Sequence, residues 1–122
     1  MAGAILGALA VALGAFGAHA LKRVADEQTV GVFHTGVEYQ FYHALALLGV
    51  GILYAQFPGA WTNRSGWCFL IGTLLFSGSL YAITLLKVSG GGSIGPAGVL
   101  TPIGGLFFIA GWVSLLISFM KH

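Results

Sequence analysis

The chain alternates between long apolar stretches and short polar connections. Four stretches contain no Asp, Glu, Lys or Arg, at residues 1–21, 39–63, 65–86 and 88–120. A helix needs roughly 20 mostly apolar residues, each rising about 1.5 Å, to cross the hydrocarbon core of a bilayer. Every stretch reaches that length, so the pattern predicts four transmembrane helices. We place them at residues 3–21, 39–57, 65–86 and 102–119.

The two longest connections between these helices differ in character. In residues 24–37, Val30, Phe33 and Val37 recur at helical spacing with polar residues between them. This spacing predicts an amphipathic interfacial helix that continues the second span outward. The connection before the fourth span is rich in glycine and predicts a flexible loop. It ends in Thr101 and Pro102, which suit a helix N-cap and a first helical position.

Composition agrees with a lipid environment. Of 122 residues, 57% are hydrophobic and only 7% are charged, and the mean hydropathy is +0.93. A soluble domain usually has about a quarter of its residues charged. Backbone polar groups within lipid must pair inside their own segment, which favours helices. The sequence therefore predicts an all-α fold, a single domain over residues 1–122 that forms an integral membrane bundle of four helices with short loops.

Several other patterns in the chain carry little weight. Residues 18–20 resemble a signal-peptide cleavage site, but no basic residue precedes the apolar run. Gly90, Gly92 and Gly95 match the dinucleotide-binding spacing, yet that fingerprint requires a preceding strand. Cys68 is the single cysteine, so no disulfide framework exists. We expect no cofactor, and a net charge of +2 spread over several connections does not predict a nucleic-acid partner.

Antiparallel helices would gather most of the polar residues of the spans near one membrane leaflet. The end of the first helix, the start of the second, the later part of the third and the start of the fourth all lie on that side. The sequence therefore predicts a ligand-binding polar cluster there. Its candidate residues are His19, Glu38, Tyr39, His43, Ser77, Ser79, Tyr81 and Thr101.

The chemistry of this predicted cluster is open. His43 lies five residues past Glu38, about 7–8 Å deeper along the helix. It is either a neutral histidine hydrogen-bonded to a Tyr or Ser, or a functional ligand or proton relay. His19, Glu38 and His43 would suffice for a metal, but their spacing matches no recognised ligand signature. We therefore expect no metal and assign no catalytic residue.

Basic residues on the same side add an anion-binding possibility. Lys22 and Arg23 follow the first span directly. The N-termini of the second and fourth helices point their positive dipole ends towards this leaflet. A lipid phosphate or small anion would be favoured at such a place.

The motifs that carry these polar residues resemble a known family. They are GAFGAHAL at 14–21, EYQFYHALALLG at 38–49, GTLLFSGSLY at 72–81 and TPIGGLFFIAGW at 101–112. In sequence and order they are similar to the bacterial membrane proteins called domain of unknown function 423, whose animal relatives are called transmembrane protein 256. The resemblance implies a small four-helix protein of the inner or plasma membrane and no assigned activity. It maps the family motifs onto the eight candidate residues together with Pro102, Gly104 and Gly105.

Three functions remain open from the sequence. The first is a non-enzymatic binding or accessory module whose polar cluster holds a lipid headgroup, a small ligand or a partner helix. The alternative is a small channel or transporter that acts as an oligomer, and the third is an intramembrane enzyme with a histidine base. Expected partners are membrane lipids and either further copies of the chain or another membrane protein. Both termini are expected on one side, with a slight preference for the cytoplasm.

Overall fold

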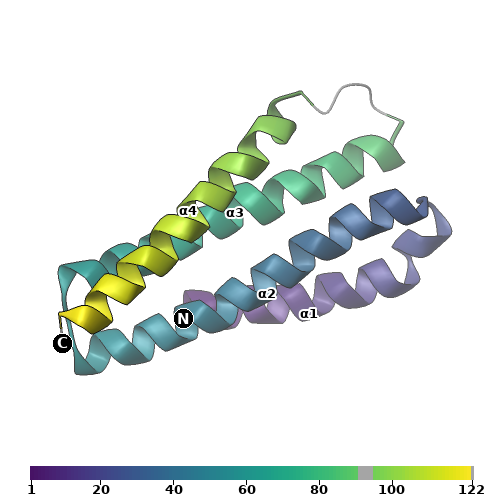
Figure 1. Cartoon of the computed structure of the whole chain (residues 1–122). Coiled ribbons are helices and arrows are strands. Elements are labelled where there is room, and N and C mark those ends of the chain that lie inside the picture. Colours follow the sequence, from purple (N-terminus) through teal and green to yellow (C-terminus); the bar gives the residue numbers. More distant parts are fainter. Residues whose placement is uncertain (91–94, 122) are drawn as a thin grey trace.

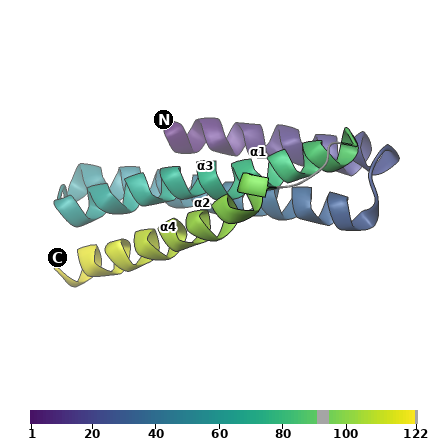
Figure 2. The same cartoon turned by 90° about the horizontal axis from the view of Figure 1, so that it is seen from above.

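The computed structural model describes residues 1–90 and 95–121, which form four long helices and one short helical turn. The elements are α1 (Ala2–His19), η1 (Leu21–Arg23), α2 (Glu27–Gln56), α3 (Ala60–Val88) and α4 (Gly95–Met120). They run alongside one another in an elongated bundle, with neighbours in the chain antiparallel (Figures 1 and 2). The predicted all-α fold class is confirmed. The α1–α2 turn, the end of α3 and the start of α4 lie at one end, which we call the loop end (Figure 1).

Helix α2 is continuous over 30 residues. It begins where the Asp26 side chain accepts a hydrogen bond from the Thr29 backbone N–H at 2.8 Å, which makes Asp26 an N-cap. It ends before Pro58, which disfavours helical backbone at the preceding Phe57. The amphipathic segment and the second span are therefore parts of one continuous helix.

Helix α4 begins seven residues earlier than predicted, and Thr101–Pro102 is not its start. The helix starts at Gly95–Pro96, where a proline in the first turn costs no hydrogen bond. Pro102 lies inside the helix. A membrane helix tolerates such a proline because neighbouring side chains satisfy the freed backbone groups. The Thr101 hydroxyl donates to the Ala97 carbonyl oxygen at 3.3 Å rather than capping the helix. Residues 91–94 of the predicted glycine-rich loop lie outside the described residues.

Glycines bring α3 and α4 into close contact. A Cβ atom on Gly104 of α4 would lie 2.5 Å from the backbone nitrogen of Phe76 on α3. On α3, a Cβ atom on Gly72 would lie 2.6 Å from the Phe108 ring of α4. Small residues at a membrane helix interface allow this approach and increase van der Waals contact. The two helices are therefore held together by backbone-to-backbone proximity and by aromatic rings seated on glycines.

Helix α1 packs on α2 through small residues with a seven-residue spacing. The buried positions of α1 are Gly3, Ala10 and Gly17. A Cβ atom on Gly3 would lie 2.7 Å from the Ala44 carbonyl oxygen, and one on Gly17 would lie 2.9 Å from the Phe33 ring. Because a spacing of seven keeps residues on one helical face, the sequence of α1 specifies a single seam against α2.

Three helices are long and apolar enough to cross a membrane: α1 with η1 (Ala2–Arg23), α3 and α4. Helix α2 does not meet the same measure of apolarity among the described residues. Its more polar residues include Gln40 and His43, and both side chains are buried within the bundle. Helix α2 contacts both α1 and α3, so it lies between helices that have the length and composition of membrane spans.

Candidate functional site

His43 is buried among aromatic rings and both of its ring nitrogens are hydrogen-bonded. Its Nδ1 lies 2.8 Å from the Tyr39 carbonyl oxygen, and Trp112 Nε1 donates to its Nε2 at 3.1 Å. A carbonyl only accepts and an indole N–H only donates, so Nδ1 carries the proton and Nε2 does not. The His43 ring is stacked on Phe108 with centroids 3.6 Å apart. His43 therefore joins α2 to α4 as a neutral histidine.

Tyr81 takes part in a hydrogen-bond chain that links three helices. Its hydroxyl donates to Gln40 Oε1 at 2.5 Å, and Gln40 Nε2 donates to the Leu6 carbonyl oxygen at 2.8 Å. The chain runs from α3 through α2 to α1. Gln40 was absent from the candidate residues, although a glutamine in a membrane span signals an interhelical hydrogen bond.

The hydroxyls of Ser77, Ser79 and Thr101 also serve helix contacts. Ser77 Oγ donates to the Gly36 carbonyl oxygen at 2.7 Å, which joins α3 to α2. Ser79 Oγ lies 2.7 Å from the Phe76 carbonyl oxygen and also bonds the Thr101 hydroxyl of α4. No histidine is among the hydrogen-bond partners described for these hydroxyls. Their geometry fits interhelical bonding rather than activation as nucleophiles.

Glu38 and His19 lie apart from this buried network. The Glu38 carboxylate accepts from the Tyr42 hydroxyl at 2.9 Å, and its other oxygen lies 3.5 Å from His34 Nε2. These three residues occupy an outward face of α2. His19 is exposed at the end of α1. Within the described chain no three His, Cys, Asp or Glu side chains are grouped to hold a metal, so His19, Glu38 and His43 are not brought together.

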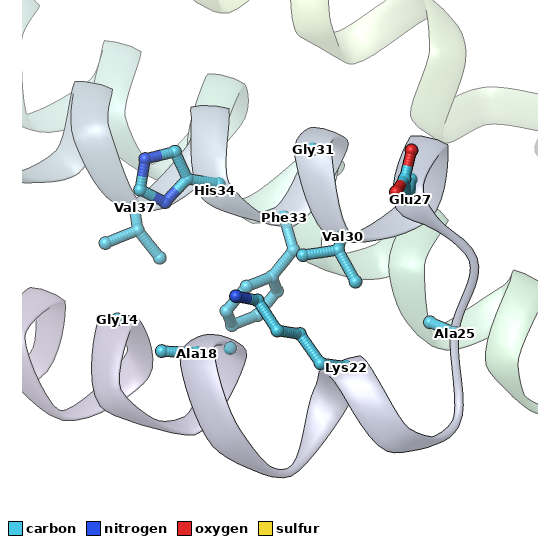
Figure 3. A pocket seen from close by; sticks show the side chains of 11 residues that line it. Gly14, Ala18, Lys22, Ala25, Glu27, Val30, Gly31, Phe33, His34 and Val37 are labelled. Atoms are coloured by element: carbon cyan, nitrogen blue, oxygen red, sulfur yellow. The ribbon is translucent and has the colours of Figure 1, made fainter.

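A groove lies between α1 and α2 at the loop end. Its volume is about 660 Å³. The wall on α1 is formed mainly by residues with little or no side chain, and the wall on α2 by larger apolar groups (Figure 3). The lining residues are Gly14, Gly17, Ala18, Lys22, Ala25, Glu27, Val30, Gly31, Phe33, His34 and Val37.

None of the eight candidate residues lines this groove. The sequence did contain a signal for it, because Val30, Phe33 and Val37 form the apolar stripe of the predicted amphipathic segment. The sequence alone does not show which residues of another helix lie opposite that stripe. Gly14 and Ala18 of α1 lie opposite it and leave space that larger side chains would fill (Figure 3).

Charged residues surround the mouth of the groove. Lys22 of η1 extends towards α2, and Glu27 stands at the first turn of α2 (Figure 3). Next to the groove, hydrogen bonding with the Thr29 side chain and backbone lowers the pKa of Asp26 from its ordinary value of 3.8. The loop end therefore presents both signs of charge beside an apolar hollow.

Known proteins place the chain in a family. The model of the family "Protein of unknown function (DUF423)" matches residues 13–105. The UPF0382 membrane protein YwdK of Bacillus subtilis is 40% identical over 121 residues, covering 98% of this chain and 94% of the relative. The UPF0382 inner membrane protein YgdD of Escherichia coli is 38% identical over 118 residues, covering 97% and 86%. No solved structure matches the chain. With the apolar helices described above, these matches show that the chain is a membrane protein with several helical spans and belongs to the DUF423, or UPF0382, membrane protein family.

Proposed function

We propose that this protein is a non-enzymatic membrane module that binds a phospholipid of the surrounding bilayer in the groove between α1 and α2. The observation that carries the proposal is the groove itself, with an apolar interior and charged residues at its mouth. Its volume of about 660 Å³ falls within the range of small-molecule sites, which is roughly 300–1,000 Å³.

The position of the groove supports a lipid rather than a water-soluble ligand. Lys22 follows an apolar helix, which fits a place at the membrane surface. From there the groove extends past Ala18 and Phe33 to Gly14 and Val37, along the part of α1 expected within the hydrocarbon. A headgroup at the mouth would leave an acyl chain beside the apolar walls. The proposal places the binding site at the predicted leaflet but on different residues.

The hydrogen bonds of the candidate polar residues also support a non-enzymatic role. His43 uses one nitrogen as a donor and the other as an acceptor, so its geometry offers no lone pair to a substrate. Ser77 donates to a backbone carbonyl rather than to a base. A histidine base with an activated nucleophile would need these groups to face each other.

The variant Ala18→Phe tests the proposal because its ring would occupy the groove from the α1 side. Ala15→Phe is the matched control, since Ala15 is an exposed residue of the same helix that does not line the groove. Each protein is extracted from mixed phospholipid bilayers in mild detergent, and the bound lipid is measured by native mass spectrometry. We expect Ala18→Phe to lose about tenfold in lipid occupancy, and Ala15→Phe to match the unaltered protein.

Equal lipid retention by both variants would refute lipid binding at this groove. Circular dichroism of each variant checks that the helices have formed. If the unaltered protein itself releases all lipid under conditions that keep it folded, the proposal also fails.

A further inference from the structure

The groove mouth carries one positive and one negative side chain, and they come from different helices. Lys22 lies just after α1 and Glu27 is the first residue of α2. The ion pair described in the structure joins His34 and Glu38 instead, so neither Lys22 nor Glu27 is paired among the residues described. Figure 3 shows the two side chains on opposite walls of the groove, with Glu27 nearer the loop.

Other charged residues near the groove have partners of their own or lie around a separate hollow. The Asp26 carboxylate caps α2 through Thr29, and Lys87 lies with them around a separate hollow of about 380 Å³. His34 lines the groove farther along α2, where it pairs with Glu38. Lys22 and Glu27 are thus the two groove residues with charges available to a ligand.

This charge pattern complements a headgroup that contains both a phosphate and an ammonium group. Lys22 would bind the phosphate, because a lysine ammonium is an effective point-charge partner for phosphate. Glu27 would accept hydrogen bonds from a primary ammonium, which has three N–H donors. A quaternary ammonium has no such donor, and the glycerol headgroup of phosphatidylglycerol offers Glu27 hydroxyl donors but no positive charge.

We propose that the groove selects a phospholipid with a primary-amine headgroup, of the phosphatidylethanolamine type, through Lys22 and Glu27. This inference rests on the proposed lipid-binding function and adds the chemical class of the ligand. The phosphate is held at η1 and the amine at the start of α2. The acyl chains then extend along the groove past Val30 and Val37.

The test uses full-length protein in bilayers with equal parts of phosphatidylethanolamine, phosphatidylcholine and phosphatidylglycerol. Bound lipid is quantified by mass spectrometry after mild extraction, and each lipid is expressed as enrichment over the bilayer. Because charge-assisted hydrogen bonds are partly screened at a membrane surface, we expect phosphatidylethanolamine to be enriched about fivefold over each of the other lipids.

Two glutamine variants identify the residues responsible. Glu27→Gln should bring the ratio of phosphatidylethanolamine to phosphatidylcholine close to one while total lipid remains bound. Lys22→Gln should reduce the binding of all three lipids. Asp26→Asn is the matched control, since it replaces a neighbouring carboxylate by an amide outside the groove and can still cap the helix at Thr29; it should retain the selectivity of the unaltered protein.

The outcomes separate this inference from the proposed function. Equal binding of the three lipids, or an unchanged preference in Glu27→Gln, overturns the headgroup assignment but leaves lipid binding in place. Preference for phosphatidylglycerol overturns it in favour of a site for anionic lipid. No bound lipid, or lipid retained in Ala18→Phe as in Ala15→Phe, overturns the proposed function itself.

Discussion

Gly104 and Gly105 are adjacent on α4, yet only Gly104 faces the backbone of α3. A Cβ atom on Gly104 would meet the Phe76 backbone nitrogen at 2.5 Å and its Cα at 2.8 Å, while one on Gly105 would meet nothing within 4 Å. Backbone atoms cannot rotate away as a flexible side chain can. An added methyl group at Gly104 therefore forces the two helices apart.

We predict that Gly104→Ala lowers the free energy of unfolding by about 1–3 kcal/mol, the usual cost of overpacking. Gly105→Ala should be neutral or slightly stabilising, because alanine has the higher helix propensity. Denaturation of both variants in the same detergent, followed by circular dichroism, measures the difference. A similar loss in both variants would mean that the α3–α4 contact is not as close as described.

The candidate polar residues show what can be predicted at the scale of single residues. Polarity within an apolar span was enough to single out His43, Ser77 and Tyr81, because unpaired polar groups in lipid are costly and rarely retained without a partner. Sequence cannot identify the partners, since Trp112 and Gly36 are distant in the chain. These residues bind other helices, so the inference of a shared ligand cluster does not follow from their polarity.

At the scale of elements, α2 shows why composition alone underestimates a span. The mean hydropathy of a segment gives each residue type a set value, whichever face of the helix the residue occupies. Gln40 and His43 are buried and hydrogen-bonded inside the bundle. Their polarity is therefore compatible with a helix inside the membrane, although it lowers the average for the segment.

The start of α2 provides a pH-dependent prediction for an element. The Asp26 pKa is lower than its ordinary value of 3.8, because its hydrogen bonds with Thr29 favour the ionised carboxylate. Ionised Asp26 therefore stabilises the start of α2 above about pH 4. This stabilisation is lost as the pH falls through the folded-state pKa of Asp26. Asp26→Ala should destabilise the helix start at neutral pH, whereas Asp26→Asn should preserve most of the cap.

Hydrogen exchange of the backbone amides of residues 27–30 measures this effect at pH 7 and at lower pH. The Thr29 amide should exchange faster in Asp26→Ala than in the unaltered protein, and this difference should shrink as Asp26 protonates. Equal protection of Thr29 in the two proteins at pH 7 would contradict the capping role.

At the scale of the whole molecule, we predict that α2 crosses the membrane together with the other three helices. Its contacts with both α1 and α3 support this topology. The test uses single cysteines that replace Val24, Gln56 or Ser89 in a Cys68→Ala background. An impermeant thiol reagent then reports on which side of the membrane each cysteine lies. Residues 24 and 89 should react from one side and residue 56 from the other. Reaction of residues 24 and 56 from the same side would show that α2 does not cross.

The oligomeric channel expected as an alternative remains a prediction, as do homo-oligomers and partner membrane proteins. The preferred orientation of the termini also remains a prediction. The topology experiment assigns that orientation directly when it is performed on sealed vesicles of known sidedness.

The sequence by itself determined the membrane class, the all-α fold and the approximate positions of the helices. These properties depend on local features, namely the length of apolar runs and the placement of charges, which act on each segment separately. It also indicated the family through motifs at residues 14–21, 38–49, 72–81 and 101–112. The start of α4 was missed, because a proline inside a helix depends on neighbouring groups that satisfy the backbone.

Only the tertiary structure decided which polar residues bind each other and where a ligand can fit. His43 meets Trp112 because α2 and α4 pack together, although they are far apart in the chain. The groove exists because Gly14 and Ala18 on α1 lie opposite Phe33 on α2. A cavity is a property of two surfaces and of the space between them, so neither helix sequence specifies it alone.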